Sequence, residues 1–469
     1  MINMRFGDIA KATGGKVVSG SAEGAASGVS IDSRTVEAGM VFLALRGPNF
    51  DGRAFVRDAA LKGAAGAVTE GMPDALGLPD GFVIIVVKDT RKALGDLAAY
   101  RRRFFSGPVV AVSGSSGKTT AKEMIAAILG RTRRVLKTEG NKNNLIGLPL
   151  TLMRLDNSYE AAVVELGISE QGEMPRLAQI CSPDAAVITN IGRGHLKTFG
   201  SLEAVARAKT ALFDSLGTEG FRIVNLDDPW LQRSALVKDR SSRAITFGHA
   251  KEADVRVRRC STTEDMISIE AVFDVRGEII DVRIAAPGVF NAMNGAAAIA
   301  AVLPFGVCKD DIAGGLASFV PVSGRMEVLR AGGVVILNDT YNANPESMAA
   351  ALMTLSSFTG RKVAVLGDML ELGGISNAAH EEAGRLAAKT GVDILVAVGQ
   401  WSKALSEGAL EAGLKPDAVF SFADKLEAQG AVSGLLRQGD TVLVKGSRAV
   451  GLEFIVDGIK AGAGNRLSQ

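Results

Sequence analysis

The stretch that most constrains the fold is GPVVAVSGSSGKTTAKEMIAAILG at residues 107–130. An apolar run at 108–112 predicts a buried strand, the Gly/Ser run at 114–117 predicts a tight loop, and good helix formers follow from Lys118. Backbone N–H groups of such a loop, at the start of a helix, form a concave cluster of donors that suits a polyphosphate. The sequence therefore predicts a nucleoside triphosphate site in this stretch.

The loop has the short form G-x-x-G-K-T-T, because Val112 stands where the longer phosphate-loop pattern has its first glycine. Lys118 is expected to reach the terminal phosphates, and Thr119 to offer its hydroxyl to Mg²⁺. The residues expected to hold the nucleotide are Gly114, Ser115, Ser116, Gly117, Lys118, Thr119 and Thr120. The alternative is a Gly/Ser turn before an ordinary helix, which is disfavoured because strand, loop and helix all fall where the motif requires them.

Length and composition limit the class of protein. At roughly 100 to 200 residues per domain, 469 residues suggest about three domains. The net charge is only +2, so nothing global favours nucleic acid or an anionic membrane surface. Cys181, Cys260 and Cys308 lie far apart, which fits a reducing compartment. The N-terminal residues have no apolar core of signal-peptide length, so we expect a cytoplasmic protein that does not insert into a membrane.

Strand-like apolar runs alternate with helical stretches from residue 107 onward, which predicts a mostly parallel sheet covered on both faces. Residues 244–284 alternate apolar and polar positions and suggest an antiparallel extension. A third unit begins near residue 317, with apolar runs at 334–337, 362–366, 394–398 and 442–444. We expect an α/β protein of three domains: a small N-terminal α/β domain at 1–106, a central P-loop ATPase domain at 107–316 and a C-terminal Rossmann-like domain at 317–469.

The N-terminal segment has a strand-like run at 41–45 and a helical run at 54–62. Before this strand lies the polar turn Asp32-Ser33-Arg34, which by itself is typical of a solvated turn. A helix is expected over 92–105, and we interpret its closing run of arginines at 101–103 as a solvated face.

Polar residues follow the central strands at the carboxyl ends, where ligands of parallel sheets gather. Glu165 ends the run at 161–164, and His195 lies in the loop after the run at 185–189. Carboxylate and imidazole groups both ligate metals, although imidazole more often binds a softer ion than Mg²⁺. For His195, the alternative is a hydrogen-bonded structural histidine. Lys209 lies in an apolar helical segment, where a lysine is usually a snorkelling surface side chain.

Two further pairs carry candidate binding groups. Asn291 and Asn294 lie three residues apart at a predicted helix start, so their amides face the same way, and they either read a base edge or cap the helix. Lys445 and Arg448 follow the last strand of the third unit. Such a cation pair suits a carboxylate or a phosphate, and a basic surface turn is the alternative.

Stretches spread over nearly the whole chain resemble the Mur ligase family of bacterial cell-wall synthesis. They are DSRTVEAGMVFLALRG (32–47), GSSGKTT (114–120), TEGNKNNLIGLPLTL (138–152), VELGISEQGEM (164–174), ITNIGRGHLKTFGS (188–201), NDTYNANPESM (338–348), VLGDMLELG (365–373) and VKGSR (444–448). GNKNNLIGLPLTL and TYNANPESM are the specific ones, because they resemble the members that use D-alanyl-D-alanine. The Asn-Pro-Arg motif of the members that add the third peptide residue is not found in the last domain.

The resemblance implies an ATP-dependent ligase with Mg²⁺ as cofactor. Its substrates would be UDP-N-acetylmuramoyl-tripeptide and D-alanyl-D-alanine, joined through an acyl phosphate. The N-terminal domain would hold the UDP end, the central domain would bind ATP, and the C-terminal domain would close over the amino substrate. No coiled coil or long apolar edge demands an oligomer, so a monomer is expected.

The resemblance also assigns roles to residues. The implied catalytic groups are Lys118, Glu165, His195 and Lys209, the last as a carbamate that would bind metal together with Thr119, Glu165 and His195. The implied contacts to ATP are Asn291, Asn294, Arg325 and Asp339, besides the phosphate loop. The implied substrate contacts are Ser33, Arg34, Asn141, Asn144, Asn342, Asn344, Lys445 and Arg448.

Three positions depart from the family pattern. Arg193-Gly194 replaces an acidic-alanine pair, Phe290 stands where a histidine is common, and Asn338 replaces an aspartate. Two other classes of protein remain as alternatives: a related ligase, such as a folate polyglutamate ligase or another Mur ligase, and a nucleotide-binding protein without catalysis. The latter would need neither Glu165, His195 nor Lys209. The sequence leaves open whether the third peptide residue is diaminopimelate or lysine.

Overall fold

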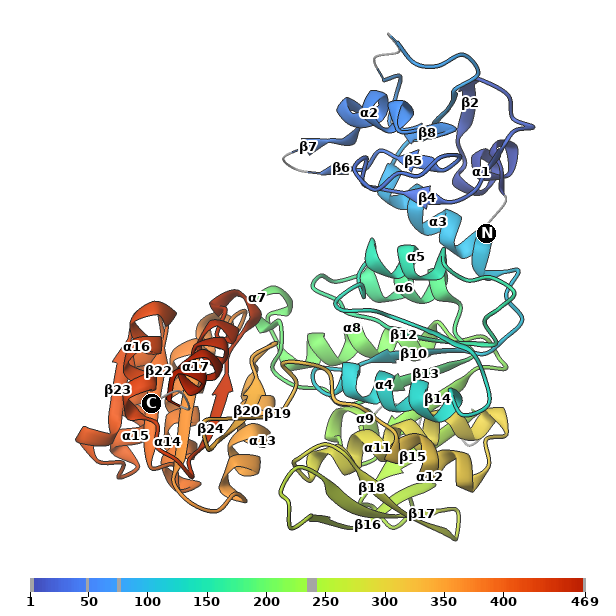
Figure 1. Cartoon of the computed structure of the whole chain (residues 1–469). Coiled ribbons are helices and arrows are strands. Elements are labelled where there is room, and N and C mark those ends of the chain that lie inside the picture. The colour runs from blue at the N-terminus through green and yellow to red at the C-terminus, as the bar shows by residue number, and fades with distance from the viewer. Residues whose placement is uncertain (1–3, 48–49, 74–76, 234–242, 467–469) are drawn as a thin grey trace.

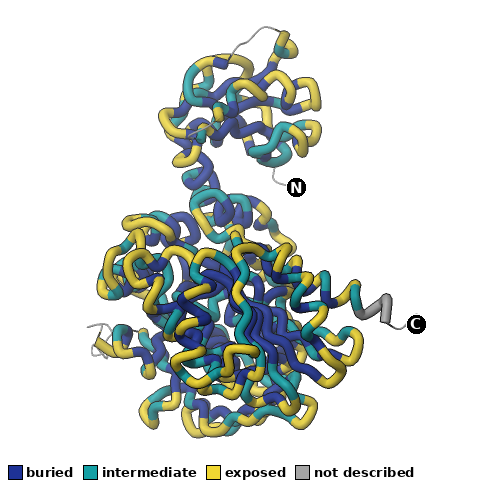
Figure 2. Tube along the Cα trace, turned by 90° about the vertical axis from the view of Figure 1, so that its left-hand side faces the viewer, coloured by how far each residue is buried: buried dark blue, intermediate teal, exposed yellow. Residues whose placement is uncertain are grey.

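The computed structural model describes residues 4–47, 50–73, 77–233 and 243–466. Its large sheets follow one another along the chain and form an N-terminal, a central and a C-terminal unit (Figure 1). Strands form a buried layer, and exposed positions lie mainly on the helices and loops around them (Figure 2). The predicted α/β class with mostly parallel sheets is confirmed.

The N-terminal sheet has the strand order β2-β9-β8-β5-β4, with only β2 antiparallel to its neighbour. Its strands are β2 (Lys16–Ser19), β4 (Val29–Ser30), β5 (Val41–Leu43), β8 (Gly66–Thr69) and β9 (Val83–Val86). The helices of this unit are α1 (Phe6–Thr13), α2 (Val56–Leu61) and α3 (Thr90–Arg102). Two short antiparallel pairs lie outside the sheet: β1 (Met4–Arg5) pairs with β3 (Ala25–Ala26), and β6 (Arg46–Gly47) pairs with β7 (Phe50–Asp51). The strand predicted at 41–45 and the helix predicted at 54–62 are confirmed, with each end within two residues of the prediction.

The central sheet has the strand order β11-β12-β10-β13-β14-β15-β16-β17-β18. Its strands are β10 (Val109–Ser113), β11 (Val135–Lys137), β12 (Ala161–Glu165), β13 (Ala185–Ile188), β14 (Phe221–Asn225), β15 (Ala244–Gly248), β16 (Val255–Thr262), β17 (Ile269–Val275) and β18 (Glu278–Ile284). The helices around it are α4 (Lys118–Leu129), α5 (Gly147–Leu152), α6 (Glu173–Cys181), α7 (Leu196–Phe199), α8 (Leu202–Asp214), α9 (Pro229–Arg233), α11 (Phe290–Val302) and α12 (Lys309–Ala317).

The antiparallel extension predicted for 244–284 is correct only in part. β16 and β18 each pair with β17 in an antiparallel manner, but β15 runs parallel to β14 and to β16. The prediction was wrong for β15. An alternation of apolar and polar residues indicates which face of a strand is buried, but it does not indicate the direction of the neighbouring strand.

The C-terminal sheet has the strand order β19-β20-β24-β21-β22-β23, and only β19 is antiparallel. Its strands are β19 (Glu327–Ala331), β20 (Val334–Asp339), β21 (Lys362–Gly367), β22 (Ile394–Val398), β23 (Val419–Phe422) and β24 (Thr441–Lys445), and its helices are α13 (Pro345–Ser356), α14 (Ser376–Lys389), α15 (Ser402–Glu411), α16 (Lys425–Leu435) and α17 (Glu453–Arg466). The four predicted strands are confirmed. β19 and β23 escaped prediction because they are edge strands in which partly exposed polar residues interrupt the apolar run.

Helix α3 joins the N-terminal unit to the central one, where it packs against α5 and α6 (Figure 1). The prediction that residues 101–103 form a solvated face is wrong for two of the three arginines. Arg101 donates two hydrogen bonds to the carbonyl of Leu155, and Arg102 donates to the carbonyl of Cys181 and to Asp184. The several N–H groups of a guanidinium can satisfy free backbone carbonyls near helix ends. Through these contacts, Arg101 and Arg102 connect helix α3 to the central unit.

No helix among the described residues is both long and apolar enough to cross a membrane.

A buried histidine in the C-terminal unit gives the fold a pH dependence. The His380 ring is fully buried: its Nε2 accepts a hydrogen bond from Met369 N at 2.8 Å, and its Nδ1 lies 2.6 Å from the carbonyl oxygen of Ser376. Burial lowers the pKa of His380 below 6.5, against opposing effects of the Ser376 carbonyl and Asp368. Protonation would also turn Nε2 into a donor facing the Met369 N–H.

We therefore expect His380 to make folding stability rise as the pH increases toward about 6.5, because below that pH the unfolded chain binds a proton that the folded ring does not. His380→Gln should lower the unfolding temperature but weaken its dependence on pH over that range. Calorimetry on wild type, His380→Gln and the exposed-site control His249→Gln measures this effect. Equal pH dependence in all three proteins would contradict the assignment.

Candidate active site

The phosphate loop follows β10 and precedes α4, as the sequence predicts. Gly114 has φ 141°, and a Cβ atom there would lie 2.0 Å from Thr189 Oγ1. Gly117 has φ 77°, and a Cβ atom there would lie 2.4 Å from Asn294 Oδ1. Both positions therefore require glycine, which allows the loop to lie against β13 and α11.

Two lysine side chains meet beneath this loop. Lys118 Nζ donates to the carbonyl oxygen of Gly114 at 2.9 Å, and Lys209 Nζ, from α8, donates to the same oxygen at 3.0 Å. Burial lowers the pKa of Lys209 well below its usual value, and the charge of Lys118 lowers it further. Burial also lowers the pKa of Lys118, while Glu165 opposes this shift and Arg325 adds to it. A lysine in an apolar helical segment is usually a surface side chain, but Lys209 is only 2% exposed.

Glu165 ends β12 beside the loop and is 1% exposed. Its Oε2 accepts a hydrogen bond from Thr119 Oγ1 at 2.7 Å, and its Oε1 accepts one from Asn143 Nδ2 at 2.9 Å. The backbone N–H of Glu165 donates to Thr138 Oγ1. The sequence reasoning named Asn141 and Asn144 but missed Asn143, although the run Asn-Lys-Asn-Asn was visible.

His195 precedes α7 with a left-handed backbone (φ 59°) and connects the central and C-terminal units. Its Nδ1 pairs with a carboxylate oxygen of Glu371, whose backbone carbonyl accepts from Lys197 N. Burial lowers the pKa of His195, Glu371 opposes this shift, and the charges of Lys209 and Lys118 add to it. Within the described ranges, no three His, Cys, Asp or Glu side chains gather closely enough to hold a metal by themselves.

The paired amides of α11 lie next to the phosphate loop. Asn291 Nδ2 donates to the carbonyl oxygen of Pro287, and Asn294 Nδ2 donates to Asn291 Oδ1 at 2.9 Å. Both residues are buried, and both line the same cavity as the loop. The predicted placement at one helix start is confirmed, and neither amide accepts from its own helix N-terminus as a cap would.

The linker and the C-terminal strand ends face the central unit. Arg325 stacks on the ring of Tyr341, with 4.0 Å from its guanidinium carbon to the ring centroid. Asp339 accepts from Met326 N and pairs with the buried Lys445 at 2.5 Å. Lys445 also donates to the carbonyl oxygen of Asn342 at 2.9 Å.

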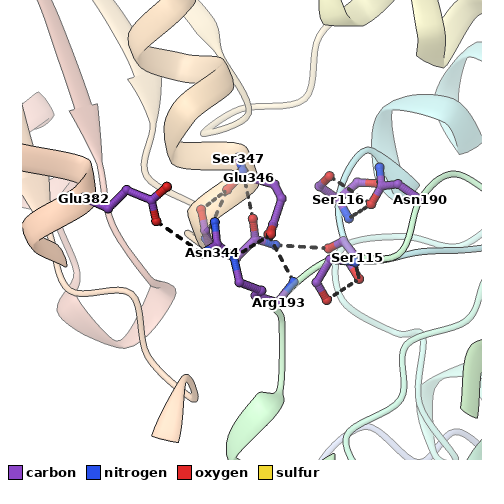
Figure 3. Close-up of polar contacts among 9 residues, drawn as sticks. Ser115, Ser116, Asn190, Arg193, Asn344, Glu346, Ser347 and Glu382 are labelled. Carbon is purple, nitrogen blue, oxygen red and sulfur yellow. Dashed lines mark hydrogen bonds and ion pairs between the residues drawn. The ribbon is translucent and has the colours of Figure 1, made fainter. Parts of the chain in front are cut away.

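The loop and the C-terminal unit also touch directly (Figure 3). Asn344 Oδ1 accepts from Ser347 N and thereby caps α13, while its Nδ2 donates to the carbonyl oxygen of Ser115 at 3.4 Å. On the other side of the loop, Asn190 Oδ1 accepts from the backbone N–H of Ser116 at 3.0 Å.

These groups share one cavity of about 610 Å³. The sequence-predicted residues that line it are Ser115, Ser116, Gly117, Lys118, Thr120, Asn141, Asn144, Glu165, His195, Lys209, Asn291, Asn294, Arg325, Asp339, Asn342, Asn344 and Lys445. Gly114 and Thr119 do not line the cavity themselves, but they bond to Lys118, Lys209 and Glu165, which do. Tyr341 and Glu346, which are not among the predicted site residues, also line it.

Three predicted residues do not line this cavity. Ser33 and Arg34 belong to a turn of the N-terminal unit, where the Arg34 guanidinium pairs with Asp32 and lowers the pKa of that carboxyl to about 2. Arg448 is exposed and pairs with Glu453 at 3.3 Å, and its guanidinium carbon lies 5.9 Å from the ring centroid of Tyr341, which lines the cavity. The structure therefore does not bring these three side chains to the phosphate loop.

Three models of one protein family match most of the chain. The Mur ligase family catalytic domain matches residues 25–102, the Mur ligase middle domain matches 112–302, and the Mur ligase glutamate ligase domain matches 324–448.

Full-length relatives agree with these matches. The chain is 37% identical to UDP-N-acetylmuramoyl-tripeptide–D-alanyl-D-alanine ligase of Bacillus subtilis, covering 92% of each chain, and 38% identical to that of Escherichia coli, covering 91% of this chain and 92% of the relative. Among solved structures, MurF from Acinetobacter baumannii has a TM-score of 0.89 at 33% identity, covering 98% of this chain and 99% of the other. MurF from Thermotoga maritima, solved in complex with ADP, has a TM-score of 0.81 at 30% identity, covering 94% and 98%. The phosphate loop, the buried acidic and lysine groups around it and these comparisons establish that the chain belongs to the Mur ligase family.

Proposed function

We propose that this protein is an ATP-dependent ligase that joins D-alanyl-D-alanine to UDP-N-acetylmuramoyl-tripeptide in peptidoglycan precursor synthesis. The products are UDP-N-acetylmuramoyl-pentapeptide, ADP and phosphate. One observation carries the proposal: the phosphate loop and the polar strand ends of the C-terminal unit line the same cavity. A nucleotide on the loop would therefore face an amino substrate held by Asn342, Asn344 and Lys445. The names of the relatives support the substrate assignment.

The reaction requires an activated carboxylate, because a carboxylate oxygen is a poor leaving group at neutral pH. In the proposed reaction, the terminal carboxylate of the tripeptide attacks the γ-phosphorus of ATP and ADP leaves, which gives an acyl phosphate. The free amine of D-alanyl-D-alanine then attacks the acyl carbon, and phosphate leaves with the carboxylate oxygen. Lys118 would stabilise the negative charge on the transferring phosphoryl group, and the surrounding C-terminal unit would exclude water and align the amine.

The residues present fit a bound Mg²⁺. The Thr119 hydroxyl and the Glu165 carboxylate are 2.7 Å apart, and hard oxygen ligands of this kind suit the ion, which usually takes only one or two protein carboxylates besides phosphates and water. His195, and Lys209 as a carbamate, would complete the surroundings. Mg²⁺, when bound there, would neutralise charge that develops on the phosphates.

Lys209 has the properties that carbamylation needs. A neutral amine nitrogen attacks the carbon of CO₂ and releases a proton, so a lowered pKa favours the reaction. Burial and Lys118 lower the pKa of Lys209 in this way. The carbamate would replace one of two neighbouring cations by an anion, which relieves their repulsion and supplies oxygen ligands.

The proposed division of labour follows the three domains, with boundaries at 106/107 and 316/317. The N-terminal domain, with Ser33 and Arg34, would hold the UDP end, and Asn141 and Asn144 would face the peptide part. Asn291, Asn294, Arg325 and Asp339 would contact the nucleotide, and Arg448 would join the amino-substrate contacts after closure. We propose a cytoplasmic monomer that binds neither nucleic acid nor membranes.

Phosphate release from ATP and Mg²⁺ should require both the UDP-tripeptide and D-alanyl-D-alanine, because the acyl phosphate turns over only when the amine attacks it. A UDP-pentapeptide should appear by mass spectrometry. Running the assay with the diaminopimelate and the lysine tripeptide shows the preference for the third residue. No release with either tripeptide, while ATP still binds, would contradict the proposed substrates.

Glu165→Gln should reduce kcat by about 10²- to 10³-fold, because it removes one charge from the ion site while keeping the side chain's shape. Raising the Mg²⁺ concentration should recover part of the loss. The matched control is Glu170→Gln, an exposed position five residues along the chain, which should retain wild-type kcat. Equal rates for the two variants would rule out the proposed role of Glu165.

Wild-type protein equilibrated with ¹³C-bicarbonate should show a carbamate resonance that Lys209→Gln lacks. Lys209→Gln should also lose at least about 10²-fold in kcat. Lys92→Gln, which changes a surface lysine, is the control for both readouts. A carbamate signal that persists in Lys209→Gln would mean that another amine is modified.

A further inference from the structure

The loop between β13 and α7, residues 189–195, is bonded to the phosphate loop. Gly192 N donates to Ser115 Oγ at 2.8 Å, and this hydroxyl donates back to the carbonyl oxygen of Gly192 at 3.1 Å. The backbone N–H of Ser115 donates to the carbonyl oxygen of Asn190 at 3.0 Å. A shift of the phosphate loop would therefore move residues 190–193 with it.

Arg193, at the end of this bonded segment, reaches the C-terminal unit (Figure 3). Its backbone N–H donates to Glu346 Oε2 at 3.1 Å, and its Nε donates to Glu346 Oε1 at 2.9 Å. One terminal guanidinium nitrogen donates to Glu382 at 3.2 Å. Glu346 lies in the first turn of α13, and Glu382 lies on α14, so one arginine connects two helices of the C-terminal unit to the central unit.

The approach between the two units is close at this point. A Cβ atom on Gly192 would lie 2.9 Å from Glu346 Oε2, so a larger residue would push the carboxylate away. Glu346 lines the active-site cavity, and Asn344, two residues earlier, contacts the phosphate loop at Ser115. The position of Glu346 is thus tied to the start of α13, which carries proposed contacts to the amino substrate.

We propose that Arg193 is a positioning residue. Through Glu346 and Glu382 it sets how the C-terminal unit approaches the phosphate loop, and so where the amino substrate lies relative to the phosphates. We name Arg193, Glu346 and Glu382 the Arg193 clamp. The effect of Arg193 on the position of the amino substrate rests on the proposed function, whereas its effect on the arrangement of the two units does not.

The expected strength of the clamp follows from its exposure. The side chains of Arg193, Glu346 and Glu382 are 33%, 39% and 62% exposed, so water and salt screen the ion pairs. The two hydrogen bonds to one carboxylate add geometric definition that a single surface pair lacks. The clamp should therefore bias the arrangement of the two units without locking it, and its effect should weaken at high ionic strength.

Arg193→Gln tests this inference, with Arg207→Gln as the matched control. Arg207 pairs with Glu203 within α8, so its loss removes an ion pair that does not cross between units. Small-angle X-ray scattering of the whole chain without ligand should give a larger radius of gyration for Arg193→Gln than for wild type or the control. The difference should shrink at about 0.5 M salt, where the screening length is only a few ångströms.

The kinetic readout separates positioning from chemistry. Arg193→Gln should raise the KM for D-alanyl-D-alanine about 3- to 30-fold, while the KM for ATP changes less than about 2-fold. Arg193→Lys, which keeps the charge but loses the fork, should fall between wild type and Arg193→Gln. Glu382→Gln should raise the KM for D-alanyl-D-alanine by a smaller factor in Arg193→Gln than in wild type, because the arginine that Glu382 pairs with is already absent.

Unchanged scattering and an unchanged KM for the dipeptide in Arg193→Gln would overturn the proposal. Equal increases in the radius of gyration and in the KM for the dipeptide in the Arg207→Gln control would overturn it as well. If wild type itself turns over no UDP-tripeptide, yet Arg193→Gln still has a larger radius of gyration, the proposed function is contradicted. The role of the Arg193 clamp in the arrangement of the two units is then still supported.

Discussion

The carbonyl oxygen of Gly114 accepts hydrogen bonds from two ammonium groups, those of Lys118 and Lys209. Burial lowers the pKa of both lysines; the charge of Lys118 lowers that of Lys209 further, and the charge of Arg325 adds to the shift of Lys118. The arrangement is favourable only if negative charge comes to the site. The Glu165 carboxylate is already present beside the loop, and the phosphates of ATP and a carbamate on Lys209 are the further negative groups that the proposed reaction would bring.

The rest of the site is arranged around that cluster by the ends of parallel strands. β10 leads into the phosphate loop, β12 ends at Glu165, and β13 leads into the loop that carries His195. The C-terminal sheet contributes in the same manner, because Asp339 and Lys445 end the neighbouring strands β20 and β24. Two parallel sheets thus present their carboxyl ends to one cavity, which is where ligands of such sheets bind.

Sequence reasoning could find the features that depend on local patterns. The strand, loop and helix at 107–130 follow from apolar periodicity and glycine positions, and the grouping of Glu165 with the loop follows from the rule on strand ends. It could not find features that depend on tertiary packing. Arg101 and Arg102 look like a solvated charge run until helix α3 brings them to carbonyls of the central unit. Likewise, Lys209 has an ordinary helical neighbourhood in sequence, and only the fold shows that it is buried beside Lys118.

The roles of Arg193 and Glu346 illustrate the same limit. Their sequence separation of 153 residues gives no sign that they pair. The family resemblance identified Arg193 as a departure from the usual pattern, but the contact that gives this departure a meaning lies between two units.

In the proposed reaction, this cavity activates a carboxylate by phosphoryl transfer before the amine attacks. Positional isotope exchange tests it most directly, with ATP that carries ¹⁸O in the bridge between the β- and γ-phosphates. With UDP-tripeptide present and D-alanyl-D-alanine absent, the label should move from the bridge to the nonbridging positions of the β-phosphate. Absence of exchange, in a preparation that forms UDP-pentapeptide once the dipeptide is added, would contradict a discrete acyl phosphate.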